Sequence, residues 1–126
     1  MSVPYGTVVM PKLLHTVSTD CAFAAVTTDG SAVTWGFANY GGYSDHVREA
    51  LNSGVQRIYS TDFAFAAVKA DGSVITWGCE RRGGNSNRVR EALSSGVQRI
   101  YSSAEAFAAV KTNGSVVTIT LRTVPF

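Results

Sequence analysis

The sequence predicts a mainly β fold of the α+β class, a tandem repeat of a β-hairpin, a short helix and a strand. Residues 18–59 and 60–101 align without a gap, and 29 of their 42 paired positions are identical. A third copy begins at Ser102 and stops at Phe126, which makes about 2.5 copies. Each copy places an Asp-Gly or Asn-Gly pair between two β-rich runs. Such periods are typical of solenoids and propellers, so we expect antiparallel sheets in a propeller- or prism-like array.

The chain of 126 residues has the length of one domain. We divide this single repeat domain into an N-terminal cap over residues 1–17, repeats over 18–59 and 60–101, and a partial repeat or C-terminal cap over 102–126. Terminal units of repeat proteins are atypical because one face has no neighbour. We therefore expect the β-rich Thr7–Met10 and Leu121–Val124 to complete the end sheets, with pairing between the two ends as one option.

Two short β-rich runs in each copy predict a hairpin. In the second copy these runs are Phe65–Lys69 and Val74–Trp77, separated by Asp71-Gly72. Asp-Gly between such runs is the strongest short hairpin signal, because it suits a type I′ turn with positive φ at both central residues. Asp29-Gly30 and Asn113-Gly114 predict the same turn in the other copies.

A glycine-rich loop over residues 79–85 separates the hairpin from a predicted helix over residues 87–93. Ser86 suits the N-cap, because its oxygen can accept a free N–H of the first turn. The apolar stripe of this helix consists of Val89, Ala92 and Leu93. Gly96 then suits the C-terminal end of this helix, where a residue in the left-handed backbone conformation is favoured. A helix of two to three turns is marginal alone, so we expect it to cover an edge or a face of a sheet.

The last element of each copy is a strand, such as Val97–Tyr101, which leads into the next hairpin. In front of the first hairpin, Leu13–Val17 occupies the repeat position of this strand. The alanines of the Ala-Phe-Ala-Ala-Val run are too small to fill a wide gap, so we expect a neighbouring sheet or helix to approach closely there. We expect Trp35, Trp77 and the phenylalanine of each copy to be buried, each contributing about 1.5–3 kcal/mol.

Composition excludes several classes of protein. The net charge is +2, with −1 over residues 1–59 and +3 over 60–126, which is much less basic than a typical nucleic-acid binder. The sequence has no run of 18 apolar residues, so it predicts no transmembrane helix. The two cysteines, Cys21 and Cys79, are not at equivalent repeat positions, and we expect reduced thiols in an intracellular compartment.

The stretch AFAAVKADGSVITWG over residues 64–78, with the Gly-Gly pair that follows it, resembles the repeat of the regulator of chromosome condensation family. The resemblance implies a β-propeller that acts as a guanine-nucleotide exchange factor or as a protein- or chromatin-binding platform. It covers about 15 residues per copy. The period is shorter than the family's, the helix replaces the outer part of a blade, and the copies are too few for a seven-bladed ring. The sequence thus looks like a divergent version, of the kind seen in long predicted proteins of protists and algae, and no exchange-factor residue is carried over.

The loop that follows each hairpin is the variable part of the repeat. Seven of the 13 positions that differ between the first two copies lie in this loop and at the start of the helix. Loops on a constant scaffold often carry binding specificity, and aromatic and arginine side chains are enriched in protein interfaces. The alternative is that these loops are only solvated. The predicted partner-binding residues are Phe37, Tyr40, Tyr43, Arg81, Arg82 and Arg88.

The remaining polar residues do not predict a catalytic, metal or cofactor site. His15 and His46 form no metal-ligand spacing with the cysteines. Ser18 and Asp20, which with His15 could be imagined as a catalytic triad, recur as Ser60 and Asp62, and this favours a role in capping a turn. The arginines could grip a phosphate or an acidic partner, but an exposed, solvated face is the favoured interpretation.

The sequence therefore predicts a non-enzymatic protein-interaction or scaffold module, an accessory subunit that binds other proteins in a larger assembly. Two alternatives stay open. One is an exchange-factor-like or chromatin-binding module, by analogy with the family. The other is a small hydrolase with an unrecognised site.

Overall fold

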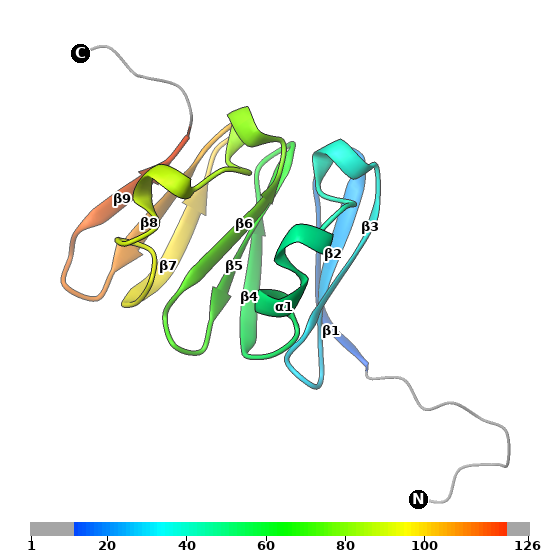
Figure 1. The fold of residues 1–126 in the computed structure, drawn as a ribbon, viewed down its shortest axis with the longest axis horizontal. Coiled ribbons are helices and arrows are strands. Elements are labelled where there is room, and N and C mark those ends of the chain that lie inside the picture. The colour runs from blue at the N-terminus through cyan, green and yellow to red at the C-terminus, as the bar shows by residue number, and fades with distance from the viewer. Residues whose placement is uncertain (1–11, 121–126) are drawn as a thin grey trace, which may run out of the picture.

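The computed structural model describes residues 12–120 as three antiparallel, three-stranded sheets arranged side by side (Figure 1). This confirms the predicted mainly β, propeller-like repeat. Thr7–Met10 and Leu121–Val124 lie outside the described residues. The first sheet contains β1 Leu13–Ser18, β2 Ala22–Thr27 and β3 Ala32–Gly36; the second contains β4 Val55–Ser60, β5 Ala64–Lys69 and β6 Val74–Gly78; the third contains β7 Val97–Ser102, β8 Phe107–Lys111 and β9 Val116–Ile119.

Each sheet combines a hairpin with the strand that precedes it in sequence. The strands that open the three sheets begin at Leu13, Val55 and Val97, and each pairs with the first strand of the following hairpin. The structural unit therefore joins the end of one sequence repeat to the start of the next. As expected from its repeat position, the segment that begins at Leu13 forms a full strand of the first sheet.

All three hairpins form, but the predicted type I′ turn is wrong. In the second sheet the Gly72 amide donates to the Lys69 carbonyl (2.9 Å), and the Lys69 amide donates to the Ser73 carbonyl (2.9 Å). Positive φ among the described residues occurs only at glycines, including Gly72 at 81°. The loop is therefore the three-residue type, in which a type I turn precedes a left-handed glycine. The side chain of Asp71 favours this turn, because its Oδ1 accepts from the Ser73 amide (2.9 Å) and hydroxyl (2.6 Å).

The predicted helix is shorter than expected. The first repeat has a 3-10 helix at Asp45–Val47 and one α-helical turn, α1 Arg48–Leu51. The second has only a 3-10 helix, Asn87–Val89, followed by turns. Ser86 does not cap it; its hydroxyl accepts instead from the Thr76 hydroxyl (2.9 Å). The first turn therefore lacks a side-chain cap, and the left-handed Gly96 follows only three residues after Leu93, which is buried between two sheets.

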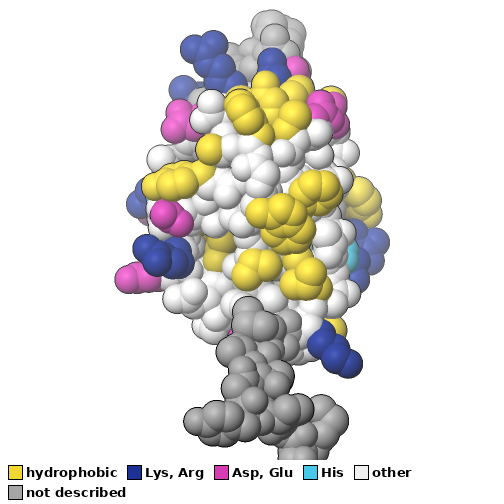
Figure 2. Space-filling view, turned by 90° about the vertical axis from the view of Figure 1, so that its right-hand side faces the viewer, with side chains coloured by type: hydrophobic (Ala, Val, Ile, Leu, Met, Phe, Trp, Pro, Cys, Tyr) yellow, Lys and Arg dark blue, Asp and Glu magenta, His cyan; other side chains and the backbone are white. Residues whose placement is uncertain are grey.

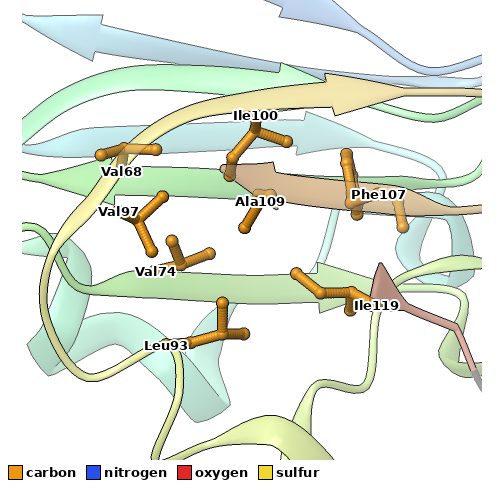
Figure 3. Close-up of a cluster of buried hydrophobic side chains, with 10 residues drawn as sticks. Val68, Val74, Leu93, Val97, Ile100, Phe107, Ala109 and Ile119 are labelled. Carbon is orange, nitrogen blue, oxygen red and sulfur yellow. The ribbon is translucent and has the colours of Figure 1, made fainter. Parts of the chain in front are cut away.

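Neighbouring sheets pack through two different faces. In the gap between the first and second sheets, Ala24 and Val26 lie against Phe65 and Trp77, with Leu51 closing the side. The gap between the second and third sheets repeats this pattern, and Figure 3 shows its cluster of buried side chains. Alternation along the strands puts the two sets of residues on opposite faces of each sheet. We call the face with Phe65 the Phe/Trp face and the opposite face, with Ala66 and Val68, the Ala/Val face.

The alanines allow the close approach that the sequence predicted. Ala64, Ala66 and Ala67 are fully buried in the second sheet. Backbone hydrogen bonds also join neighbouring sheets. The Val97 amide donates to the Gly72 carbonyl (2.9 Å), and the Asp62 amide donates to the Ala104 carbonyl (3.0 Å). Each sheet is thus held by its direct neighbours through both side chains and backbone.

The two tryptophans occupy equivalent positions in different surroundings. Trp77 is fully buried, and its Nε1 donates to the Gly41 carbonyl (3.1 Å). Trp35 is 40% exposed and stacks on Phe23, which is 44% exposed. The expected burial of Trp35 and of Phe23 is therefore wrong. The reason is that within residues 12–120 no sheet lies in front of the first one.

The same substitution at the two tryptophans should separate these environments. We expect Trp77→Phe to lower the free energy of unfolding by about 1–3 kcal/mol, because the buried Gly41 carbonyl loses its donor. Trp35→Phe should change it by less than about 0.5 kcal/mol, as for most surface substitutions. Urea titration of both variants measures the difference, and equal losses would contradict the assignment of burial.

The turns should respond to acid. Hydrogen bonds from the side chain and backbone of Ser73 hold the pKa of Asp71 below its ordinary value. A lowered pKa means that the carboxylate stabilises the fold above the unfolded pKa of about 3.9, and that this contribution is lost as pH falls through the folded pKa.

We expect Asp71→Asn to keep the hairpin but to remove the part of the pH dependence of stability that comes from the Asp71 carboxylate. The third hairpin is the natural control, because the Oδ1 of Asn113 accepts from the Ser115 amide (2.9 Å) and hydroxyl (2.7 Å) in the same way. The carboxyl titration, followed by NMR, and thermal unfolding between neutral and acid pH measure the effect. A carboxyl midpoint at or above the ordinary aspartate value would contradict it.

Candidate protein-binding surface

The two variable loops leave their sheets at the same end and share one backbone shape (Figure 1). Each contains a 3-10 helix, Ala38–Tyr40 in the first and Glu80–Arg82 in the second. The hydroxyl of Thr34 donates to the Gly42 carbonyl (3.2 Å), and Thr76 makes the same bond to Gly84 (3.2 Å). The anchoring residues are thus the same in both repeats, while most of the outward side chains differ.

Glycine is required where the first loop passes over the second sheet. Gly41 has a φ of 109°, and a Cβ there would collide with the ring of Phe65. Its carbonyl is also the acceptor for Trp77. The core therefore fixes the height of this loop above the sheets, and the loop can vary only in its outward side chains.

Side chains from the two loops meet on Phe63, which lies in the turn before β5. The ring of Tyr40 packs edge-on against Phe63, with 4.9 Å between centroids, and the guanidinium of Arg82 lies 4.2 Å from the same ring centre. Phe37 extends this group through an edge contact with Tyr40 at 5.0 Å. Arg82 Nε lies 3.7 Å from an oxygen of Glu105. We call these five residues the aromatic row; it crosses all three repeats.

Phe63 and Glu105 were not among the predicted site residues. They occupy the same repeat position as Cys21, in the turn between the first two strands of each sheet. The sequence held a signal for them, because this position also differs between the copies. It lies far from the loop in sequence, and only the fold shows that the two variable places are neighbours.

An open groove of about 580 Å³ lies beside the row, between the first and second repeats. Tyr43 and His46, whose rings stack with centroids 5.8 Å apart, line one side, and Glu80 and Arg90 lie among the lining residues from the second repeat. Both signs of charge and two rings thus border the groove. This mixture suits a polar protein segment better than a polyanion.

The structure divides the predicted site residues into two groups. Phe37, Tyr40 and Arg82 belong to the aromatic row, and Tyr43 lines the groove. Arg81 and Arg88 are exposed and do not line this groove. The arginines do not converge on one point, and Arg82 already pairs with a carboxylate of the chain itself.

The residues considered for catalysis make structural contacts between sheets. His15 Nε2 lies 3.2 Å from the Ile58 carbonyl, and the Ser18 carbonyl accepts from the Ser60 hydroxyl (3.0 Å). Within residues 12–120, no three His, Cys, Asp or Glu side chains gather in a way that could hold a metal ion. The described part of the chain has no helix long and apolar enough to cross a membrane.

Sequence comparison finds no matching family model and no matching curated protein. Solved structures do match. Prp20p of Saccharomyces cerevisiae superposes with a TM-score of 0.60 at 14% identity, over 90% of this chain and 32% of that one. The ectodomain of the receptor kinase CR4 of Physcomitrella patens gives 0.60 at 15% identity, over 86% and 30%. Human WBSCR16 gives 0.54 at 20% identity, over 86% and 34%.

Sequence identities of 14% to 20% show that the fold is shared, and they do not show a shared activity. This chain spans only 30% to 34% of the length of those three proteins. One of the matching structures is yeast RCC1 (Prp20) bound to Kap60. The chain thus has the fold of a divergent β-propeller-type repeat like that of the regulator of chromosome condensation.

Proposed function

We propose that the chain, acting as a single repeat domain over residues 1–126, is a non-enzymatic protein-interaction scaffold and an accessory subunit of a larger assembly. One observation carries this proposal. Most residues that build the sheets and anchor the loops are repeated, whereas eight of the 13 positions that differ between the first two repeats lie in the variable loop, at the start of the short helix and at the position of Phe63. Variation concentrated in the loops of a constant framework is typical of a binding surface.

The chemistry of the row suits a protein partner. Aromatic and arginine side chains dominate the energetics of protein interfaces. Phe63 is held between Tyr40 and Arg82, so these three side chains are already ordered before a partner arrives. Ordering in advance reduces the entropy lost on binding.

The charges around this surface disfavour nucleic acid as the partner. Glu80 lies beside the groove, and Glu105 neutralises Arg82 at the end of the row. A nucleic-acid surface would need a continuous run of unneutralised basic groups. We propose a partner that presents a mixed polar and aromatic segment.

We also propose a reducing, intracellular compartment. Both cysteines are free thiols, and Cys21 is exposed. Exposed free thiols are typical of reducing compartments, since an oxidising one favours their conversion to disulfides.

An exchange of loops tests the proposal. Residues 37–46 are replaced by the sequence of residues 79–88, so that both repeats carry the second loop. We expect the melting temperature to change by only a few degrees, because the same framework already carries this loop. Recovery of the stoichiometric partner from native extract, quantified by mass spectrometry against the unmodified chain, should fall at least about tenfold, roughly 1.4 kcal/mol.

The matched control changes an exposed residue away from the row and the groove, Gln98→Glu. This variant should recover the partner as the unmodified chain does. Undiminished recovery by the loop-exchanged chain would contradict the proposed surface. A chain that recovers no stoichiometric partner would contradict the scaffold function as a whole.

The similarity to Prp20p favours one rival function. That protein was studied for its binding to Gsp1p and histones, which makes an exchange-factor-like or chromatin-binding role the alternative for this chain. Nucleotide release from small GTPases, and binding to histones, measure it directly. Accelerated release or saturable histone binding would support the rival, and the absence of both would exclude it.

A further inference from the structure

The first sheet exposes an apolar face at the end of the array. Leu13, Phe23, Val33 and Trp35 on this face are 40% to 54% exposed. Figure 2 looks onto this end, where hydrophobic side chains occupy the middle and charged side chains the rim. A contiguous exposed apolar face with a polar rim marks an interaction site.

The repeat itself shows what this face is suited to contact. Phe23, Val33 and Trp35 occupy the repeat positions of Phe65, Ile75 and Trp77. Those three residues form the Phe/Trp face of the second sheet, which packs on the Ala/Val face of the first. Phe107, Val117 and Ile119 of the third sheet pack on the second in the same manner. At both junctions inside the chain, a Phe/Trp face is covered by an Ala/Val face.

The other end of the array presents the complementary surface. On the third sheet Tyr101 is 57% exposed and Val116 is 61% exposed. They share this face with Ala108 and Val110, their partners or near neighbours across the strands. The same residue types cover Phe107 within the chain, where the second sheet presents Tyr59, Ala66, Val68 and Val74.

We propose that the chain associates head to tail with a second copy of itself, the Phe/Trp face of the first sheet of one copy seated on the Ala/Val face of the third sheet of the next. The junction between copies then repeats, with similar residues at equivalent positions, a junction that already forms twice inside each copy. It is a heterologous contact, so it can continue beyond two copies unless the ring closes. This inference is independent of the proposed function.

The junction between copies is weaker than the internal ones. Inside the chain the loop that follows each hairpin contributes the Gly41 carbonyl to Trp77, and Leu51 closes the gap. The sequence after Ile119 contains no Gly-Gly pair. We therefore expect the association to be reversible and to depend on concentration.

Sedimentation of the full chain from micromolar to millimolar concentration tests the inference. We expect the average mass to rise with concentration. The emission of Trp35 should shift to shorter wavelength in parallel, because association buries this ring while Trp77 is buried throughout. A chain that remains monomeric over this range would overturn the proposal.

Two substitutions at opposite ends test the head-to-tail geometry. Val33→Arg blocks the Phe/Trp face of the first sheet, and Val116→Arg blocks the Ala/Val face of the third. Both residues are exposed, so both variants should fold, as circular dichroism and thermal melting will show. Each variant alone should associate at least about tenfold more weakly than the unmodified chain. Asn52→Arg, at an exposed position between the sheets, is the control that should associate normally.

A mixture of the two blocked variants gives the decisive result. The Val33→Arg chain keeps the Ala/Val face of its third sheet unblocked, and the Val116→Arg chain keeps the Phe/Trp face of its first sheet unblocked. An equimolar mixture should therefore form a 1:1 dimer and nothing larger. Continued self-association of Val116→Arg would mean that two Phe/Trp faces meet each other, and a mixture without a dimer would mean that the two ends do not meet; either result overturns the proposal.

Discussion

The packing of bulky side chains of one sheet on the small side chains of the sheet before it determines the rest of the structure. Ala24 lies opposite Phe65 and Trp77, and Ala66 lies opposite Phe107. Alanine allows two sheets to approach, and the aromatic rings fill the space that remains. The loop after β3 is then held at a fixed height by Gly41, and the outward side chains of that loop form the candidate binding surface.

The repeat made much of this fold predictable, because each local signal occurs three times. Hairpins, the glycine stops at Gly54 and Gly96, and the buried alanines follow directly from the pattern. The errors arise where details outside the repeat pattern decide the outcome. The turn type depends on hydrogen bonds from Ser73 to Asp71, and the predicted helix lacks its cap because the Ser86 hydroxyl bonds to Thr76 instead. The exposure of Trp35 depends on a neighbour that no local pattern describes.

The candidate site was predictable in part, for the same reason. Variation between the copies pointed to Phe37, Tyr40 and Arg82, which the fold brings together. It did not show that these side chains meet on Phe63, because that residue belongs to another strand connection. Arg81 and Arg88 share the same sequence signal but stand apart from the row and the groove. Sequence variation therefore marked a region, and only tertiary contacts distinguished the residues that act together within it.

The backbone bonds between sheets have a consequence for how the molecule comes apart. The Val55 amide bonds to the Gly30 carbonyl, and Val97 does the same with Gly72, so each sheet is tied only to those beside it. In such a linear arrangement unfolding can start at either extremity and advance one layer at a time. The middle layer, enclosed on both flanks, gives up its amide protons to solvent last, whereas the outer layers exchange them through partial openings.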